Sequence, residues 1–181
     1  MSAFQWRPLR RDDLEAVASV AALAFPDHYE APACFAERLR LSPSWCFALE
    51  HGRGELEGYL LAWPWPLGSV PPLNRLVGSL AEQDRGLFIH DLALRPQAAG
   101  RGLAGGIVRR VIEQARSAGF EAVALVAVND TTAFWRRQGF GDAELAPEVR
   151  EKLAAYGESA RYMVRPVNSA DQRSSSAETR D

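Results

Sequence analysis

The amino-acid sequence predicts a single α/β (or α+β) domain on a mixed sheet. Expected elements follow the order strand, two helices, three strands, helix, strand, helix and strand. A glycine-rich turn joins one strongly apolar strand directly to an amphipathic helix. The 181 residues are enough to bury one core. We expect the domain to span residues 1–167, and residues 168–181, which lack a large apolar side chain, to form a disordered tail.

The N-terminal half begins with an expected strand at Phe4–Arg10. A first helix follows, with Asp12 and Glu15 in capping-box spacing at its start. A second helix begins near Pro32, because proline is tolerated in a first helical turn. Two strands then flank a polar turn: Trp45–Glu50 and Leu56–Trp63.

Residues 64–86 are rich in proline and glycine and are too long for a hairpin turn. They predict either a functional lid or a locally disordered insertion. Leu87–Leu94 is an apolar strand, and the apolar stripe of Leu103–Ser117 predicts a helix. The remaining elements are a strand, a short helix and a last strand: Glu121–Val128, Thr131–Gln138 and Arg161–Val167.

Composition excludes several classes of function. The formal charge of −2 predicts no general attraction to nucleic acid or to anionic membranes. No apolar run reaches the roughly 20 residues that span a bilayer. The two cysteines, Cys34 and Cys46, are too few for a disulfide framework or a metal cluster. We therefore expect a cytoplasmic protein with no metal, no nucleic-acid partner and no membrane partner.

The segment 92–106 carries the chemistry. Gly100 and Gly102 allow a ligand to approach the backbone closely. The helix that follows presents its first N–H groups, which form an anion site with the helix dipole. Arg95 and Arg101 add positive charge suited to phosphate. The turn predicts a pyrophosphate site, and a turn without a ligand remains the alternative.

Two other phosphate-binding loops fit less well. A Walker A loop needs a Gly-Lys pair, which the sequence lacks. Gly100–Gly105 fits GxGxxG, but Glu121, at the spacing of the ribose-binding acid, begins a strand instead of ending one. A dinucleotide enzyme of the Rossmann type is therefore the weaker alternative.

The string RPQAAGRGLAGGIV, residues 95–108, resembles the acetyl-CoA motif [QR]xxGx[GA] of the GNAT N-acetyltransferases. Ala99 stands where that family usually has Gln or Arg, so phosphate binding is expected to depend on Arg101 and the backbone. Thr132–Phe140 resembles the AxxFYxxxGF segment of the family's coenzyme-binding helix, and Asn129 precedes it, one residue out of register. The resemblance covers roughly residues 1–167.

This resemblance implies an acetyl-CoA-dependent N-acetyltransferase with a mixed, mostly antiparallel sheet flanked by helices. Two parallel strands are implied to splay apart at the coenzyme. Acetyl-CoA is the implied co-substrate, and the acceptor is a primary amine of a small molecule or peptide, acetylated by direct transfer in a ternary complex. The implied coenzyme contacts are Leu92, Ala93, Leu94, Ala99, Gly100, Arg101, Gly102, Leu103, Ala104, Asn129, Phe134 and Trp135.

His90 and Asp91 are the candidate catalytic residues. The family often has Glu where this chain has His90, and an imidazole that titrates near neutrality suits a general base. Strand alternation predicts that the two side chains lie on opposite faces. Structural roles remain the alternative for both. Trp135 replaces the tyrosine that often protonates the leaving thiolate, which leaves Tyr162 and Tyr29 as candidate substitutes.

The acceptor cleft is implied to lie between Pro26–Glu30 and Trp63–Asn74. Two acids would attract an ammonium and two tryptophans would stack on the acceptor: Asp27, Glu30, Trp63 and Trp65. Ordinary loop packing is the alternative for each. The identity of the amine and a homodimer are left open. The rival function is a catalytically weak or inactive acyl-CoA-binding regulatory module. Ala99 and Trp135, which depart from the family motifs, favour it.

Overall fold

One mixed sheet organises the protein. The computed structural model describes residues 3–52 and 54–167. Within them, seven strands lie in the order β1-β2-β3-β4-β5-β7-β6. Their bounds are β1 Phe4–Pro8, β2 Cys46–His51, β3 Glu55–Pro64, β4 Gly86–Leu94, β5 Ala122–Ala127, β6 Gly141–Asp142 and β7 Arg161–Pro166. The neighbours β4 and β5 are parallel, and the other pairs are antiparallel.

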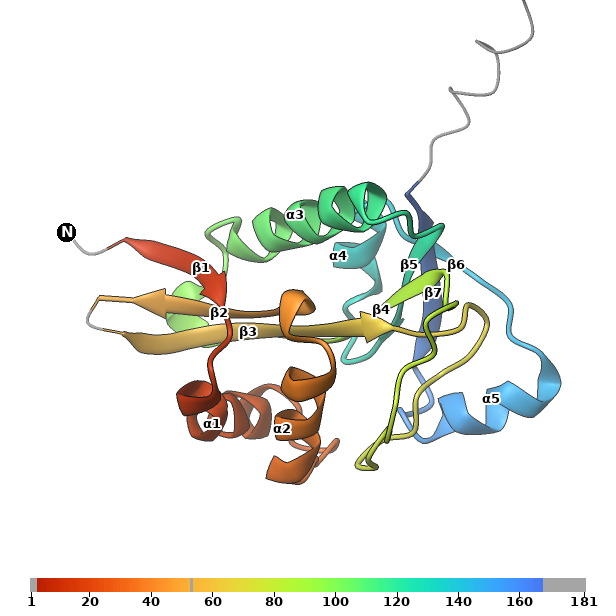
Figure 1. Ribbon diagram of the computed structural model, residues 1–181, viewed down its shortest axis with the longest axis horizontal. Coiled ribbons are helices and arrows are strands. Elements are labelled where there is room, and N and C mark those ends of the chain that lie inside the picture. The colour runs from red at the N-terminus through yellow and green to blue at the C-terminus, as the bar shows by residue number, and fades with distance from the viewer. Residues whose placement is uncertain (1–2, 53, 168–181) are drawn as a thin grey trace, which may run out of the picture.

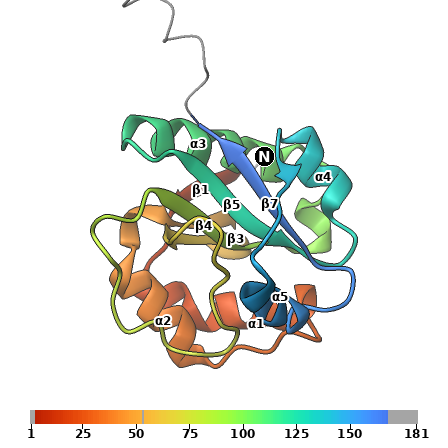
Figure 2. The ribbon, with the colours of Figure 1, turned by 90° about the vertical axis from the view of Figure 1, so that its right-hand side faces the viewer.

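Helices cover both faces of this sheet (Figures 1 and 2). Their bounds are α1 Leu14–Ala24, α2 Pro32–Leu41, α3 Leu103–Ser117, α4 Thr132–Arg137 and α5 Pro147–Ala154. One face carries α1, α2 and α5, and the other carries α3 and α4. In the described part of the chain, no helix is both long and apolar enough to cross a bilayer.

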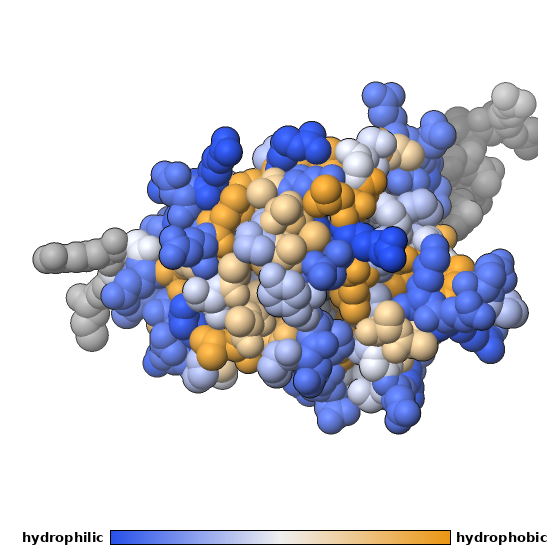
Figure 3. All heavy atoms as spheres, turned by 90° about the horizontal axis from the view of Figure 1, so that it is seen from below, coloured by the Kyte–Doolittle hydropathy of each residue, from blue (hydrophilic) through white to orange (hydrophobic). Residues whose placement is uncertain are grey.

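Each face of the sheet buries its own hydrophobic core. Val17, Phe35 and Tyr59 belong to the core under α1 and α2. Ile107 and Trp135 belong to the core under α3 and α4. Because apolar residues from neighbouring strands contribute to both cores, the central strands read as nearly continuous apolar runs. The face with α1 and α2 still shows apolar atoms among the polar ones (Figure 3).

The parallel pair separates partway along its length. Pairing between β4 and β5 begins at Gly86↔Ala122 and ends at Ile89↔Leu125. Beyond it, residues 91–94 pair only with β3, so one edge of β4 is free of β5. This splay confirms the predicted fold class, a mixed, mostly antiparallel sheet with flanking helices.

A β-bulge at His90 corrects the predicted alternation. Leu61 pairs with Asp91 and Ala62 pairs with Ile89, so His90 has no partner in β3. A bulge inserts one extra residue into a strand and resets which face the next side chain occupies. His90 and Asp91 therefore lie on the same side of β4 and line one cavity. The prediction of opposite faces was wrong.

Other departures are local. The sequence analysis missed β6 and α5, two short elements near the C-terminus. The predicted capping pair Asp12 and Glu15 is replaced by Asp13, whose carboxylate accepts the Arg10 N–H at 2.7 Å. The 64–86 segment packs against the domain, with Val70 fully buried. The predicted disordered tail at 168–181 lies outside the described residues.

Substitution of Gly58 in β3 tests how tightly β3 packs against β4. A Cβ on Gly58 would lie 2.6 Å from the Ala93 carbonyl oxygen. Gly58→Ala is therefore expected to lower the free energy of unfolding by about 1–3 kcal/mol, measured by urea denaturation. Gly106→Ala is the matched control, because no atom lies within 4 Å of its Cβ position in α3. It should raise that free energy by about 0.5–1 kcal/mol. Equal effects of the two substitutions would contradict this account.

Candidate active site

The glycine turn ends directly in the N-terminus of α3. Gly100 and Gly102 have φ values of +71° and +76°, which side chains other than glycine rarely adopt. No atom lies within 4 Å of a Cβ position at either glycine, so the space beside the turn is open. The first helical bond of α3 runs from Gly106 N–H to the Gly102 carbonyl at 3.0 Å. The N–H groups between these two residues precede it and are available to an anion.

Beside this turn lies an apolar cavity of about 190 Å³, between the free edge of β4, β5 and the two helices α3 and α4. Its lining includes five of the residues predicted to contact the coenzyme: Leu92, Leu94, Ala104, Phe134 and Trp135. Phe25, His90, Val126, Val128 and Thr131 complete the lining. We call it the coenzyme-side cavity.

The other predicted coenzyme residues lie outside this cavity. Ala93 is buried in the core under α1. Arg101 donates from Nε to the Gln97 carbonyl at 2.9 Å, and Asn129 donates from its amide to the Ala24 carbonyl at 3.3 Å. Arg101 and four more residues belong to the turn and the start of α3: Ala99, Gly100, Gly102 and Leu103. The backbone that was predicted to bind a pyrophosphate therefore adjoins the cavity at Ala104.

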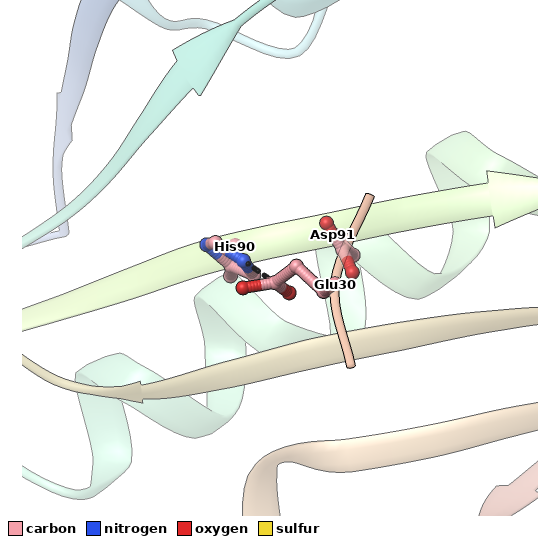
Figure 4. A group of neighbouring side chains, drawn as sticks. All are labelled: Glu30, His90 and Asp91. Carbon is pink, nitrogen blue, oxygen red and sulfur yellow. Dashed lines mark hydrogen bonds and ion pairs between the residues drawn. The ribbon is translucent and has the colours of Figure 1, made fainter. Parts of the chain in front are cut away.

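His90 forms a buried pair with Glu30 (Figure 4). The His90 Nε2 atom lies 3.0 Å from Glu30 Oε2, and the two side chains are 2% and 4% exposed. The other ring nitrogen, Nδ1, is buried and has no partner among the described residues. Because a carboxylate only accepts, Nε2 carries the proton in this bond and Nδ1 is the nitrogen left to gain one.

Arg38 and Trp63 hold this pair in place, and Tyr59 binds the neighbouring Asp91. Arg38 donates to Glu30 Oε1 at 2.9 Å, and its guanidinium lies 5.0 Å from the ring of Trp63. The Trp63 ring also packs on His90, with 4.9 Å between ring centroids. Asp91 accepts the Tyr59 hydroxyl at 3.0 Å. Trp63 is 1% exposed, so its ring is not available to stack on an acceptor, which was one of the two roles considered from the sequence. It supports the imidazole of His90 instead.

Burial and facing charges shift the pKa values in this cluster. Burial opposes a charged Glu30, but His90 and Arg38 lower the pKa of Glu30 to about 2. Burial also opposes a charged His90, yet Asp91 and Glu30 raise the pKa of His90 above its ordinary 6.5. Burial raises the pKa of Asp91. The facing charges therefore favour the charged forms of His90 and Glu30, whereas burial opposes them.

A second cavity lies on the other side of His90. Its lining combines acidic and polar groups with apolar side chains: Ala21, Phe25, His28, Glu30, Phe35, Leu73, His90, Asp91, Val126, Val128 and Tyr156. We call it the acidic cavity. It shares Phe25, His90, Val126 and Val128 with the coenzyme-side cavity. Of these four, His90 is the titratable one, so it faces both spaces.

Sequence reasoning missed most of the cluster that surrounds His90. It considered Glu30 only as an acid beside the acceptor cleft that attracts an ammonium, and it gave no role to Arg38 or Tyr59. The sequence around Glu30, Arg38 and Tyr59 contains no recognisable motif. These residues come together only through tertiary packing, so no local pattern could have predicted the cluster. Neither tyrosine proposed as the general acid lines a cavity: Tyr29 is 70% exposed, and the Tyr162 hydroxyl accepts the Gly68 N–H at 2.9 Å.

Glu30, His90 and Asp91 are also residue types that bind metal ions. Ligand-capable atoms of Glu30, His90 and Asp91 lie within 4.8 Å of one another. Both Glu30 oxygens already accept hydrogen bonds, however, from His90 on one side and from Arg38 and the Asn74 N–H on the other. A cation would have to displace these donors beside a fixed guanidinium. The arrangement fits proton transfer better than metal binding.

Comparison with known proteins agrees with this geometry. The model of the acetyltransferase (GNAT) family matches residues 6–140. No curated protein sequence matches the chain.

Solved structures share the fold at low sequence identity. Ard1 from Thermoplasma volcanium aligns with a TM-score of 0.69 at 17% identity, over 92% of this chain and 99% of that one. The ribosomal-protein-S18-alanine N-acetyltransferase of Escherichia coli aligns at 0.64 and 15% identity, over 94% and 98%. Escherichia coli YhbS, solved in complex with CoA, aligns at 0.60 and 17% identity, over 93% and 83%. With its fold and most of its length matched in this way, the chain belongs to the GNAT acetyltransferase family.

Proposed function

We propose that this protein is an acetyl-CoA-dependent N-acetyltransferase that transfers the acetyl group directly to a primary amine in a ternary complex, in the cytoplasm and without a metal. The observation that carries this proposal is the position of His90, which lines both the coenzyme-side cavity and the acidic cavity. A proton acceptor between two substrate spaces is what direct transfer requires.

The coenzyme-side features fit acetyl-CoA. The open turn at Gly100 and Gly102 and the start of α3 suit the pyrophosphate. The free edge of β4 between residues 90 and 94 offers backbone groups to an extended arm. The coenzyme supplies the acetyl group as a thioester when it is bound. A backbone N–H on that edge would stabilise negative charge on the thioester oxygen.

His90 is the proposed general base. Glu30 holds the proton on Nε2, so Nδ1 accepts the proton that the amine must lose before it attacks, directly or through one water. The acidic cavity, with a volume of about 30 Å³, has room for about two waters. Asp91 lies on the same side and favours a positive charge there. A cationic substrate nitrogen is therefore attracted to the atom that deprotonates it.

Among the described residues, no tyrosine lines the coenzyme-side cavity. Trp135, at the tyrosine position of the family motif, is 7% exposed and packs edge-on against Phe134 and Phe140. An indole N–H is not an acid in water. A thiol has an ordinary pKa of about 8.5, so the thiolate can leave and gain its proton from solvent.

The rival proposal is an acyl-CoA-binding regulatory module with little or no catalysis. Ala99 and Trp135 favour it, because each removes a side chain that the family motif supplies. Binding of acetyl-CoA without acetyl transfer to any amine in a broad panel would support the module and contradict the transferase.

Replacing the base gives the first test of function. His90→Gln is expected to lower kcat by about 10²–10⁴-fold, because the imidazole no longer accepts a proton. Acetyl-CoA affinity, measured by calorimetry, should stay close to that of the wild type. Release of CoA thiol with an amine panel reports kcat. His51→Gln on β2, outside both cavities, is the matched control. Full activity of His90→Gln at every pH would contradict the assignment.

The pH profile tests the role of Glu30. The wild-type kcat/KM should rise with pH as His90 loses its proton, with a midpoint above 6.5 because the facing carboxylates raise its pKa. Glu30→Gln removes one of these negative charges, lowers the pKa of His90 and should move the rising limb to lower pH. Glu37→Gln is the matched control on α2, because Glu37 binds the N–H groups of Val77 and Gly78 and not His90. An unmoved limb in Glu30→Gln would contradict the pairing.

Glutamine is one of the two residues that the family motif usually has at position 99, so introducing it tests whether the turn binds the pyrophosphate. Ala99 is exposed, so Ala99→Gln can add one hydrogen bond to a phosphate without a clash. We expect CoA to bind about 2–10-fold more tightly, corresponding to roughly 0.5–1.5 kcal/mol for one hydrogen bond. Affinity for acetyl-pantetheine, which has no pyrophosphate, should not change, and calorimetry measures both. Equal gains for the two ligands would place the pyrophosphate elsewhere.

A further inference from the structure

The edge strand β1 contacts the glycine turn and the start of α3 through two half-buried aromatic side chains. Phe4 and Trp6 are two residues apart on β1, so both lie on the face of the sheet that α3 covers. The Trp6 Nε1–H donates to the Leu103 carbonyl at 3.1 Å. The centre of the Phe4 ring lies 5.4 Å from Cζ of Arg101. One aromatic residue thus contacts the helix, and the other contacts the turn.

The start of α3 lacks a capping side chain. Its N-cap residue is Gly102, which offers no side-chain oxygen to the first N–H groups, and the first helical turn contains no acid. Glycines such as Gly100 and Gly102 also lose more conformational freedom on folding than other residues. Among the described residues, the bond from Trp6 to Leu103 is the one hydrogen bond that joins residues 96–106 to a side chain of another element. The order of this segment therefore depends on Trp6.

Arg101 is held in a way that keeps its outer nitrogens free. Its Nε donates to the Gln97 carbonyl at 2.9 Å, and its guanidinium makes a cation–π contact with Phe4. In the part of the chain that the structure describes, its two Nη atoms make no hydrogen bond. The forked donors of a guanidinium match phosphate oxygens. Because Arg101 directly precedes Gly102, these donors and the free N–H groups belong to the same end of α3.

We propose that Trp6 and Phe4 are positioning residues for the coenzyme: Trp6 fixes the first turn of α3, and Phe4 holds Arg101 for the pyrophosphate. A site that is ordered before it binds loses less conformational entropy on binding, so its affinity is higher. The need is greater here because Ala99 supplies no polar side chain to the turn. The inference deepens the proposed function and rests on its coenzyme-binding part, not on acetyl transfer.

Trp6→Phe tests the contact with α3. The substitution removes the indole N–H and keeps an aromatic ring on β1. Calorimetry is expected to show that CoA binds about 3–10-fold more weakly, the equivalent of one lost hydrogen bond. Affinity for acetyl-pantetheine, which has no pyrophosphate, should not change. In the transfer assay, KM for acetyl-CoA should rise while kcat at saturation stays close to that of the wild type.

Gln114→Ala is the matched control for Trp6→Phe. Gln114 donates from Nε2 to the Ser44 carbonyl at 2.9 Å, so it also joins α3 to the rest of the domain, but it lines neither cavity. Its affinity for CoA should equal that of the wild type, and urea denaturation reports whether each variant is folded. Unchanged CoA affinity in Trp6→Phe would overturn the role of Trp6. An equal loss in Gln114→Ala, or an equal loss for acetyl-pantetheine, would overturn it too.

A double-mutant cycle tests the contact with the turn. Phe4→Leu removes the ring beside Arg101 and should weaken CoA binding by about 2–5-fold, as for an exposed cation–π contact. In an Arg101→Gln background it should have no further effect, because Phe4 acts through Arg101. Arg110→Gln removes the same charge from α3, where Arg110 lies 4.8 Å from the ring of Phe47 and lines neither cavity. In that background Phe4→Leu should keep its full effect. Additive effects of Phe4→Leu and Arg101→Gln would overturn the role of Phe4.

The measurements distinguish this inference from the proposed function. CoA binding that depends on Trp6 and Phe4, without acetyl transfer to any amine, would overturn the transferase and leave this inference standing. Acetyl transfer with unchanged CoA affinity in both variants would overturn this inference and leave the transferase standing. A wild-type protein that binds no CoA would overturn both.

Discussion

The Glu30 carboxylate is the interaction on which the site depends. One oxygen accepts from His90, and the other accepts from Arg38 and from the Asn74 backbone. A buried carboxylate without such partners would be costly, but here each oxygen is satisfied and the two cations are fixed in turn. The same bonds set the tautomer of His90 and anchor the segment between β3 and β4. The orientation of His90 and the position of the segment between β3 and β4 thus share one cause.

The sheet provides the second constraint. The bulge at His90 places it beside Asp91 on one side of β4, and the end of pairing at Ile89 opens the strand toward β5. A regular strand would have sent the two side chains to opposite faces and left the acid away from the base. Because the irregularity and the splay occur at adjacent residues, the two cavities meet at the imidazole.

The departures from the family motifs have different consequences on the two sides of the site. Ala99 and Trp135 remove side chains from the coenzyme side, where backbone groups and an apolar cavity remain. On the acceptor side the polar groups are numerous and paired, and Trp63 fills the space behind His90. The coenzyme-side cavity therefore offers mainly backbone and apolar shape, whereas the acidic cavity offers buried charge.

The sequence by itself determined the family, the order of the main elements and the glycine turn, because these depend on local spacing: apolar periodicity, a strand that runs into Gly100 and Gly102, and the motif at Thr132–Phe140. It also singled out His90. It did not reveal the partners of His90, because Glu30 and Arg38 meet it only when α2 and the preceding loop pack on the sheet. Strand pairing decided the bulge, and hydrogen bonds between distant segments, such as His28 to the Tyr156 carbonyl, decided the lining of the acidic cavity. No local sequence pattern records either.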